Sequence, residues 1–122
     1  MRRSRENDRL RLQHMFDPAQ LAIDFVQNTD RETVETSQIL QNGLAKTIQD
    51  IGEAANNLTN GFRSEHPEIP WRDITDMRNF LVHVYFEIDI EIVWKTATED
   101  LPPLLDRLED ILRSDISKSW RD

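Results

Sequence analysis

The sequence contains no cysteine, so a disulfide framework, a thiolate zinc site and a cysteine nucleophile are all excluded. It has only 3 glycines and 5 prolines in 122 residues, fewer than a turn-dense β architecture needs. No apolar run approaches the roughly 20 residues that cross a bilayer, and no apolar stretch follows the N-terminal arginines as in a secretion signal. These absences favour an all-α protein of the cytoplasm and argue against secretion or membrane insertion.

The charge is strongly negative, with 15 basic and 23 acidic residues and a net charge of -8. This balance argues against wholesale electrostatic capture of nucleic acid, which relies on many Lys and Arg side chains. The segment 1–11 is the exception, because it contains five arginines and only two acidic residues, Glu6 and Asp8. We interpret it as a solvated helix start or a frayed tail, with a phosphate-tracking arm as the alternative.

The segment 6–28 is expected to form the first helix. Four side chains lie there at broadly helical spacing, namely Leu10, His14, Ile23 and Val26. His14 is interpreted as a surface or helix-packing histidine. Pro18 lacks a backbone donor and crowds the carbonyl of His14, so a kink or restart is predicted there with Asp17 as the cap.

The second helix has the strongest pattern in the chain. Thr29 and Glu32 have capping-box spacing, and apolar residues then recur every three or four positions, at Leu40, Leu44, Ile48, Ile51, Ala55 and Leu58. This helix is predicted to run to about Thr59, where Asn60 and Gly61 would end it. The internal Gly52 indicates that another helix approaches closely.

A loop is expected over 61–70, after which Pro70 can open a third helix. The predicted inward stripe of that helix consists of Ile74, Met77, Leu81 and Val84 or Tyr85.

The run FEIDIEIVW, residues 86–94, alternates apolar and acidic side chains with the period of a half-buried strand. A single strand would have no partner in this sequence, so we interpret the run as a junction in which Asp89 caps a fourth helix. A further restart is predicted at 100–103. The result is an antiparallel bundle of four or five helices in one domain, 1–122, with flexible tails at 1–5 and 114–122.

The stretch RNFLVHVY, residues 78–85, embeds polar groups in the most apolar part of the chain. Arg78, Asn79 and His83 would each cost free energy in a dry interior, so their presence calls for a reason. On a helix, Asn79 and His83 lie one turn apart on a second, largely apolar face. A symmetric dimer would bury that face and bring the same residues of both copies into one cleft.

Such a cleft contains the groups that cleave a phosphodiester. An imidazole can move a proton, and a guanidinium can hold a phosphate in a fork and stabilise charge in the transition state. RNA supplies its own 2′-hydroxyl nucleophile, so no metal is needed, and no clustered metal-ligand set is present in the sequence. The alternative is structural, with Arg78 paired to Asp76 or Glu53 and His83 a satisfied, half-buried residue.

A family resemblance adds to this reading. HPEIPWRDITDMRNFLVHVYFEIDIEIVW with DLPPLLDRLEDIL, together with LQHM and IGEAANNL, resembles the HepT-like branch of the HEPN superfamily over roughly 6–112. The family's R-x4-H-x-Y signature falls on Arg78, His83 and Tyr85, with Asn79 at a frequent polar position.

The resemblance implies a homodimeric, metal-independent endoribonuclease of prokaryotes, without a cofactor, that acts on tRNA or mRNA as the toxin of a toxin–antitoxin pair. It also implies a nucleotidyltransferase antitoxin of the MNT family that neutralises the toxin by transferring AMP to Tyr85. Asp76 stands where the family commonly has glycine, and Phe80 and Val84 replace residues that are often polar. Glu53 and Asp76 are supporting candidates.

Two other interpretations remain open. The first is a catalytically inactive binding module that docks a nucleotidyltransferase, which the acidic surface favours. The second is a structural helical bundle with no partner, which would tolerate changes throughout 78–85.

Overall fold

The structure is a computed structural model that describes residues 5–79 and 88–119. These residues form helices and contain no strand, so the prediction of an all-α protein is confirmed. No described helix combines the length and the apolar character needed to cross a membrane. The elements in chain order are α1 (Arg5–Gln27), α2 (Arg31–Glu35), α3 (Gln38–Asn56), α4 (Asn60–Glu65), α5 (Trp71–Asp76), the 3-10 helix η1 (Met77–Asn79), α6 (Ile90–Lys95), the π-helical turn η2 (Thr96–Asp100) and α7 (Leu101–Ser119).

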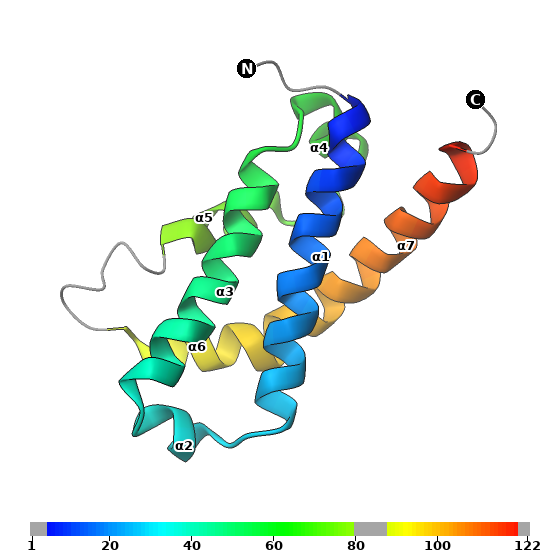
Figure 1. Cartoon of the computed structure of the whole chain (residues 1–122). Coiled ribbons are helices and arrows are strands. Elements are labelled where there is room, and N and C mark those ends of the chain that lie inside the picture. The colour runs from blue at the N-terminus through cyan, green and yellow to red at the C-terminus, as the bar shows by residue number, and fades with distance from the viewer. Residues whose placement is uncertain (1–4, 80–87, 120–122) are drawn as a thin grey trace.

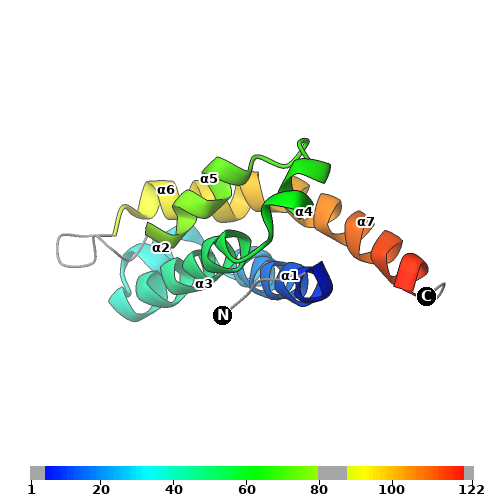
Figure 2. The ribbon, with the colours of Figure 1, turned by 90° about the horizontal axis from the view of Figure 1, so that it is seen from above.

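The helices are arranged in two layers. Helices α1 and α3 run antiparallel side by side, and α5 and α6 lie against one face of this pair (Figures 1 and 2). Helix α7 packs against α1 and extends to Ser119, into the segment that was expected to be a tail. The long helices therefore enclose one core, to which the short helices add edges.

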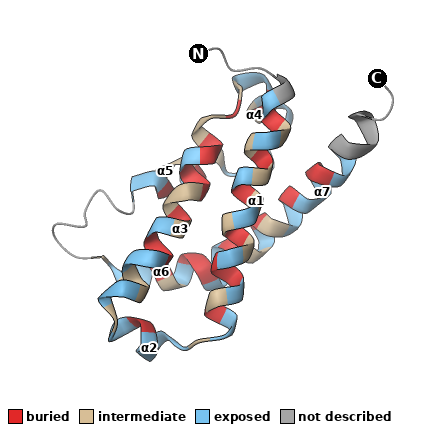
Figure 3. Ribbon diagram, in the orientation of Figure 1, coloured by how far each residue is buried: buried red, intermediate tan, exposed pale blue. Residues whose placement is uncertain are grey.

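Buried side chains mark one side of α1 and recur every three or four residues, at Leu12, Met15, Ala19, Ala22, Ile23 and Val26 (Figure 3). Of the residues in the predicted pattern, Ile23 and Val26 are buried and Leu10 is exposed. His14 is exposed, in agreement with its interpretation as a surface or helix-packing residue. The apolar stripe expected in α3 is buried largely as predicted, including Ile48 and Ile51.

Helix α1 continues through Pro18, so the predicted break was wrong. The missing donor removes one backbone bond, at a cost of about 3 kcal/mol in an isolated helix. Contacts of α1 with α3 and α7 on either side of the proline hold the helix together. Asp17 does not cap a restart, and its carboxylate accepts a hydrogen bond from Gln13 Nε2 at 2.7 Å.

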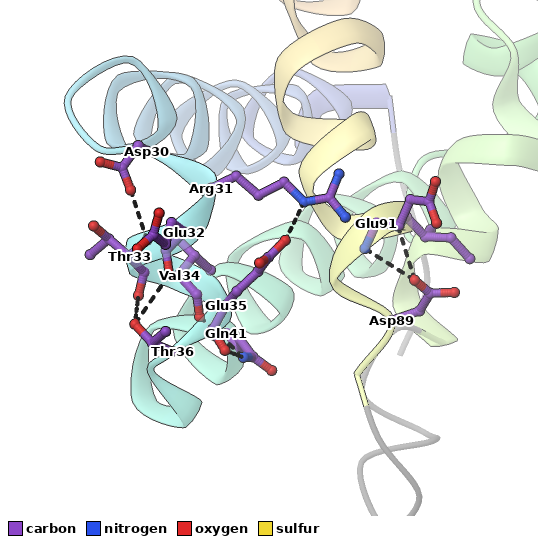
Figure 4. Close-up of polar contacts among 11 residues, drawn as sticks. Asp30, Arg31, Glu32, Thr33, Val34, Glu35, Thr36, Gln41, Asp89 and Glu91 are labelled. Atoms are coloured by element: carbon purple, nitrogen blue, oxygen red, sulfur yellow. Dashed lines mark hydrogen bonds and ion pairs between the residues drawn. The ribbon is translucent and has the colours of Figure 1, made fainter.

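The predicted second helix is divided into two, because two caps act where one was expected. Asp30 caps α2 by accepting from the Thr33 backbone N–H at 2.7 Å (Figure 4). Ser37 caps α3 by accepting from the Leu40 N–H at 3.2 Å. The backbone hydrogen bond from Thr33, with a smaller contribution from its side chain, lowers the pKa of Asp30 below its ordinary value.

The expected stop at Asn60 and Gly61 is instead the first turn of α4. Thr59 Oγ1 accepts from the Phe62 N–H at 3.2 Å and so caps this helix. The buried carboxylate of Asp8 holds the cap in place, accepting from Thr59 N at 2.9 Å and from Thr59 Oγ1 at 2.6 Å. A contact from α1, distant in sequence, therefore creates a helix where local composition predicts a loop.

The interpretation of 86–94 as a junction is confirmed over its described part. The Asp89 side chain caps α6, accepting from the backbone N–H groups of Glu91 and Ile92 (Figure 4). Helix α7 begins at Leu101, within the range predicted for a restart, but it follows α6 and η2 without an intervening loop. The wider turn of η2, closed from Leu101 N–H to Thr96 O, leads the chain into the prolines at the start of α7.

Candidate active site

Arg78 and Asn79 lie in η1, the short 3-10 helix that follows α5. Met77 is buried, and its two successors are exposed. The buried methionine therefore fixes the turn, while the arginine and asparagine side chains face solvent. The remaining motif residues, His83 and Tyr85, lie outside the described residues, as does the predicted second apolar face of helix three.

Helix α3 contacts the backbone of Arg78 at two residues, Gln49 and Gly52. Gln49 Nε2 donates a hydrogen bond to the carbonyl oxygen of Arg78 at 2.9 Å. At Gly52, a Cβ atom would stand 2.4 Å from Arg78 N and 2.9 Å from Ile74 O, closer than real Cβ atoms come. The close approach predicted at Gly52 is therefore confirmed, and the element that approaches is the turn that carries Arg78.

The guanidinium of Arg78 is not neutralised by either predicted acid. Within residues 5–79 and 88–119, Arg78 forms no ion pair with Asp76 or Glu53. Asp76, at the end of α5, is exposed. In this part of the chain, the arginine is thus left with its positive charge available.

Glu53 lies on the outer side of α3, beside a groove between α1 and α3 of about 480 Å³. His14, Asp17 and Asp50 also line this groove. The structure thus places Glu53 with residues of α1 and Arg78 with Gly52 and Gln49. No group of three or more His, Asp or Glu side chains among the described residues is arranged to hold a metal ion.

Sequence reasoning missed Gln49. Its position, one helical turn before Gly52, was the available signal, because residues three apart share a helix face. A glutamine on a helix is usually solvated, however, and only the fold shows that this amide reaches a carbonyl of another element.

Comparison with known proteins gives a family match over most of the chain. The model of a family described as "Ribonuclease HepT-like" matches residues 15–111. A protein of Thermococcus cleftensis, named as a probable ribonuclease HepT, is 34% identical over 100 residues, covering 82% of this chain and 91% of that protein.

Two further relatives have provisional names as RNases. One, from Caldanaerobacter subterraneus subsp. tengcongensis, is 30% identical over 104 residues, covering 85% of this chain and 93% of the relative. The other, from Methanocaldococcus jannaschii, is 30% identical over 98 residues, covering 80% and 90%. No solved structure matches the chain significantly.

Proposed function

Because the chain belongs to the HepT-like ribonuclease family of the HEPN superfamily, we propose that it cleaves RNA without a metal ion, at a site shared by two copies. Each copy contributes the R-x4-H-x-Y residues Arg78, His83 and Tyr85, together with Asn79. The substrate is a cellular RNA, either tRNA or mRNA.

In this mechanism His83 removes the proton of a ribose 2′-hydroxyl, and the resulting oxygen attacks the adjacent phosphorus. The bond from phosphorus to the 5′-oxygen breaks, and that oxygen receives a proton from an imidazole. The products are a 2′,3′-cyclic phosphate and a 5′-hydroxyl. Arg78 stabilises the added negative charge on the phosphorane oxygens, and Asn79 orients the phosphate or the imidazole.

The observation that carries this proposal is the way Arg78 is positioned, in a chain that belongs to a family of ribonucleases. Its carbonyl accepts a hydrogen bond from Gln49 and its backbone nitrogen packs closely against Gly52 of the same helix, while its side chain is exposed. A fixed backbone and an unneutralised guanidinium are what a phosphate-binding group needs, because a rigid site loses little on reorganisation during the reaction.

The proposed biological role is that of a toxin restrained by a nucleotidyltransferase antitoxin. Transfer of AMP to the Tyr85 hydroxyl would add bulk and a phosphate charge two residues from His83. The added phosphate would compete with RNA for the same guanidinium groups. Incubation with ATP and the partner nucleotidyltransferase is expected to add AMP to the wild-type chain and none to a Tyr85→Phe variant, as measured by mass spectrometry.

The test of the ribonuclease is cleavage of RNA in the presence of EDTA. Arg78→Ala is expected to lower the rate on the order of 100-fold or more, and His83→Ala by a similar or larger factor. Arg72→Ala, which removes an exposed arginine of α5, is the matched control and should retain activity. Cleavage that requires an added metal, or that survives both motif substitutions, would contradict the proposal.

A second candidate is a catalytically inactive module that docks a nucleotidyltransferase. The net charge of -8 favours it, because an acidic surface repels RNA. It predicts tight binding of the partner, weaker binding of Arg78→Ala, and no RNA turnover by the wild-type chain.

A further inference from the structure

Helix α1 carries a regular stripe of exposed side chains, part of which borders the groove toward α3. Six exposed side chains recur at intervals of three or four residues, namely Asn7, Leu10, His14, Asp17, Leu21 and Asp24. Leu10 is 50% exposed and Leu21 62% exposed, although both are large apolar residues. His14, Asp17 and Leu21 line the groove toward α3, whose other lining residues include Asp50 and Glu53. The spacing is that of a seam between two packed helices.

We propose that two copies of the chain associate through this stripe, with their α1 helices antiparallel. A two-fold axis that crosses the helix between Met15 and Phe16 places Leu10 opposite the partner's Leu21. The same axis places His14 opposite the partner's Asp17. Symmetry then forms each of these pairs twice, because a two-fold interface joins one surface patch to itself.

Each layer of this seam pairs side chains of complementary chemistry. Leu10 and Leu21 bury apolar surface on each other, while the imidazole of His14 can donate a hydrogen bond to a carboxylate. The outermost layer sets the amide of Asn7 against the carboxylate of Asp24. A shift of one heptad would place leucine against a charged or amide side chain, so this register is the one that satisfies the whole stripe.

The distribution of charge along α1 favours the antiparallel direction. Its first half carries three arginines and two acidic residues, a net charge of +1, whereas Asp17 and Asp24 are the charged residues of its second half. An antiparallel pair brings the arginine-bearing half of each helix to the acidic half of the other, and a parallel pair would align like charges. This local complementarity opposes the general repulsion between two chains that each carry a charge of -8.

The groove beside Leu21 gives independent support. An apolar groove of about 330 Å³ between α1 and α3 is lined by Leu21, Phe25, Ile39 and Gly43, among others. Ile39 is 82% exposed, and a Cβ atom at Gly43 would have nothing within 4 Å. Glycine is unfavourable inside a helix. At Gly43, however, no neighbour among the described residues is close enough to exclude a larger side chain. The space fits the approach of a second chain, whose Leu10 would arrive at the edge of this groove.

This contact is separate from the proposed catalytic cleft. Gly52 and Gln49 of α3 face η1, whereas Asp50, Ala54 and Asn57 of the same helix face the groove toward α1. Figures 1 and 2 show α1 beside α3 in one layer and α5 against α3 in the other layer. The proposal therefore does not rest on the ribonuclease activity, and both contacts can form in one larger assembly.

The absence of cysteine allows a test of the register by cross-linking. A Leu10→Cys variant mixed with a Leu21→Cys variant, with oxidised glutathione and roughly 100 µM protein, is expected to give a disulfide-linked pair; the concentration suits a small, single-helix interface. Each variant alone should give little product, because the axis sets two copies of position 10 roughly 16 Å apart along the helix. Ile92→Cys mixed with Leu21→Cys is the control, since Ile92 is a similarly exposed aliphatic residue of α6. Equal yields from the mixture, the single variants and the control would overturn the proposal, as would no cross-link in the mixture.

A charge exchange tests the central layer without cysteine. His14→Glu alone and Asp17→Lys alone should each weaken self-association at least tenfold in sedimentation velocity. The first change sets a carboxylate opposite Asp17 of the other copy twice, and the second removes the carboxylate that accepts from His14 in both pairs. Mixing the two variants should restore association, since the new glutamate of one copy then faces the new lysine of the other. Unchanged association of the single variants, or no recovery on mixing, would exclude this register. Circular dichroism of each variant confirms that the helices are intact.

Discussion

At the scale of single residues, the two glycines of α3 differ in what a methyl group would meet. At Gly52 it would meet the backbone of Arg78 at 2.4 Å, and at Gly43 it would meet nothing within 4 Å. Backbone atoms cannot rotate out of the way as the end of a side chain can. A side chain is therefore excluded at Gly52 by the turn that carries Arg78, whereas Gly43 has room for one.

Gly52→Ala is expected to lower the free energy of unfolding by roughly 1–3 kcal/mol, because η1 must shift away from α3. Gly43→Ala is the matched control and should raise it by up to about 1 kcal/mol, since alanine is the better helix former. Denaturant unfolding of both variants measures the difference. Equal stabilities would show that η1 yields without cost.

Gln49 is expected to act on the reaction through the position of Arg78. Gln49→Met keeps the length of the side chain but loses the donor to the Arg78 carbonyl, and we expect about a tenfold lower rate of RNA cleavage. In an Arg78→Ala background the same change should have no further effect, because the group that it positions is gone.

The control for Gln49 is Gln41→Met. The Gln41 amide also donates to backbone carbonyls, those of Val34 and Glu35, and lies about two helical turns before Gln49 on α3. Its loss should affect stability and leave the rate unchanged. Additive effects of Gln49→Met and Arg78→Ala on the rate would show that Gln49 acts by another route.

The sequence could predict some of these residues and not others. Gly52 was recognisable because glycine is unfavourable inside a helix, and Arg78 because a charge in an apolar run needs a reason. Leu10 was grouped with the buried Ile23 and Val26 but is exposed, since helical spacing defines a stripe without saying which way it faces. Gln49 gave no signal of its own. His83 and Tyr85 stay predictions, because they lie outside the described residues.

At the scale of helices, Asp8 connects α1 to the start of α4. Its buried carboxylate accepts two hydrogen bonds from Thr59, the residue that caps α4. Removing it would leave the Thr59 backbone N–H without this acceptor and free the threonine hydroxyl to turn away from Phe62. The first turn of α4 would then lose its main support.

Asp8→Ala is therefore expected to lower the free energy of unfolding by about 2–3 kcal/mol, the size of hydrogen bonds to a charged group. Asp106→Ala, which removes an exposed carboxylate of α7, should change it by less than about 0.5 kcal/mol. Chemical denaturation of the two variants compares them directly. A loss at Asp8 no larger than at Asp106 would mean that α4 needs no support from α1.

The helix boundaries show why local sequence was an incomplete guide. Asp89 was identified as a cap because its signal lies within three residues of the donors that it satisfies. Thr59 was predicted to end a helix, whereas it caps the start of α4. The residue that accepts its hydrogen bonds, Asp8, lies in α1 and is distant in sequence. Tertiary contacts likewise carry α1 through Pro18, and no window of neighbouring residues contains that information.

At the scale of the whole molecule, composition was sufficient for the fold class. The scarcity of glycine and the helical spacing of apolar residues predicted an all-α protein, and the described helices confirm it. The net charge says little about the fold, but it limits how RNA could bind. A molecule with a net charge of -8 can attract RNA only through a few local cations.

If RNA is held mainly by one Arg78 from each copy, its binding should depend weakly on salt. Two phosphate contacts to single-stranded RNA predict a slope of roughly -1.4 for log K against log salt concentration. Fluorescence anisotropy with a labelled RNA and the His83→Ala variant, which should bind without turnover, measures that slope. A slope several times steeper would point to a broader basic surface, with the arginines of segment 1–11 as the first candidates.

The packing of α1 against α7 also has a consequence for biosynthesis. Helix α1 emerges from the ribosome early, but one of the helices that cover it is among the last described elements of the chain. Until then part of its apolar surface remains open to chaperones and to other nascent chains. Slowing translation after α3 should therefore lengthen the period in which the growing chain is prone to aggregate.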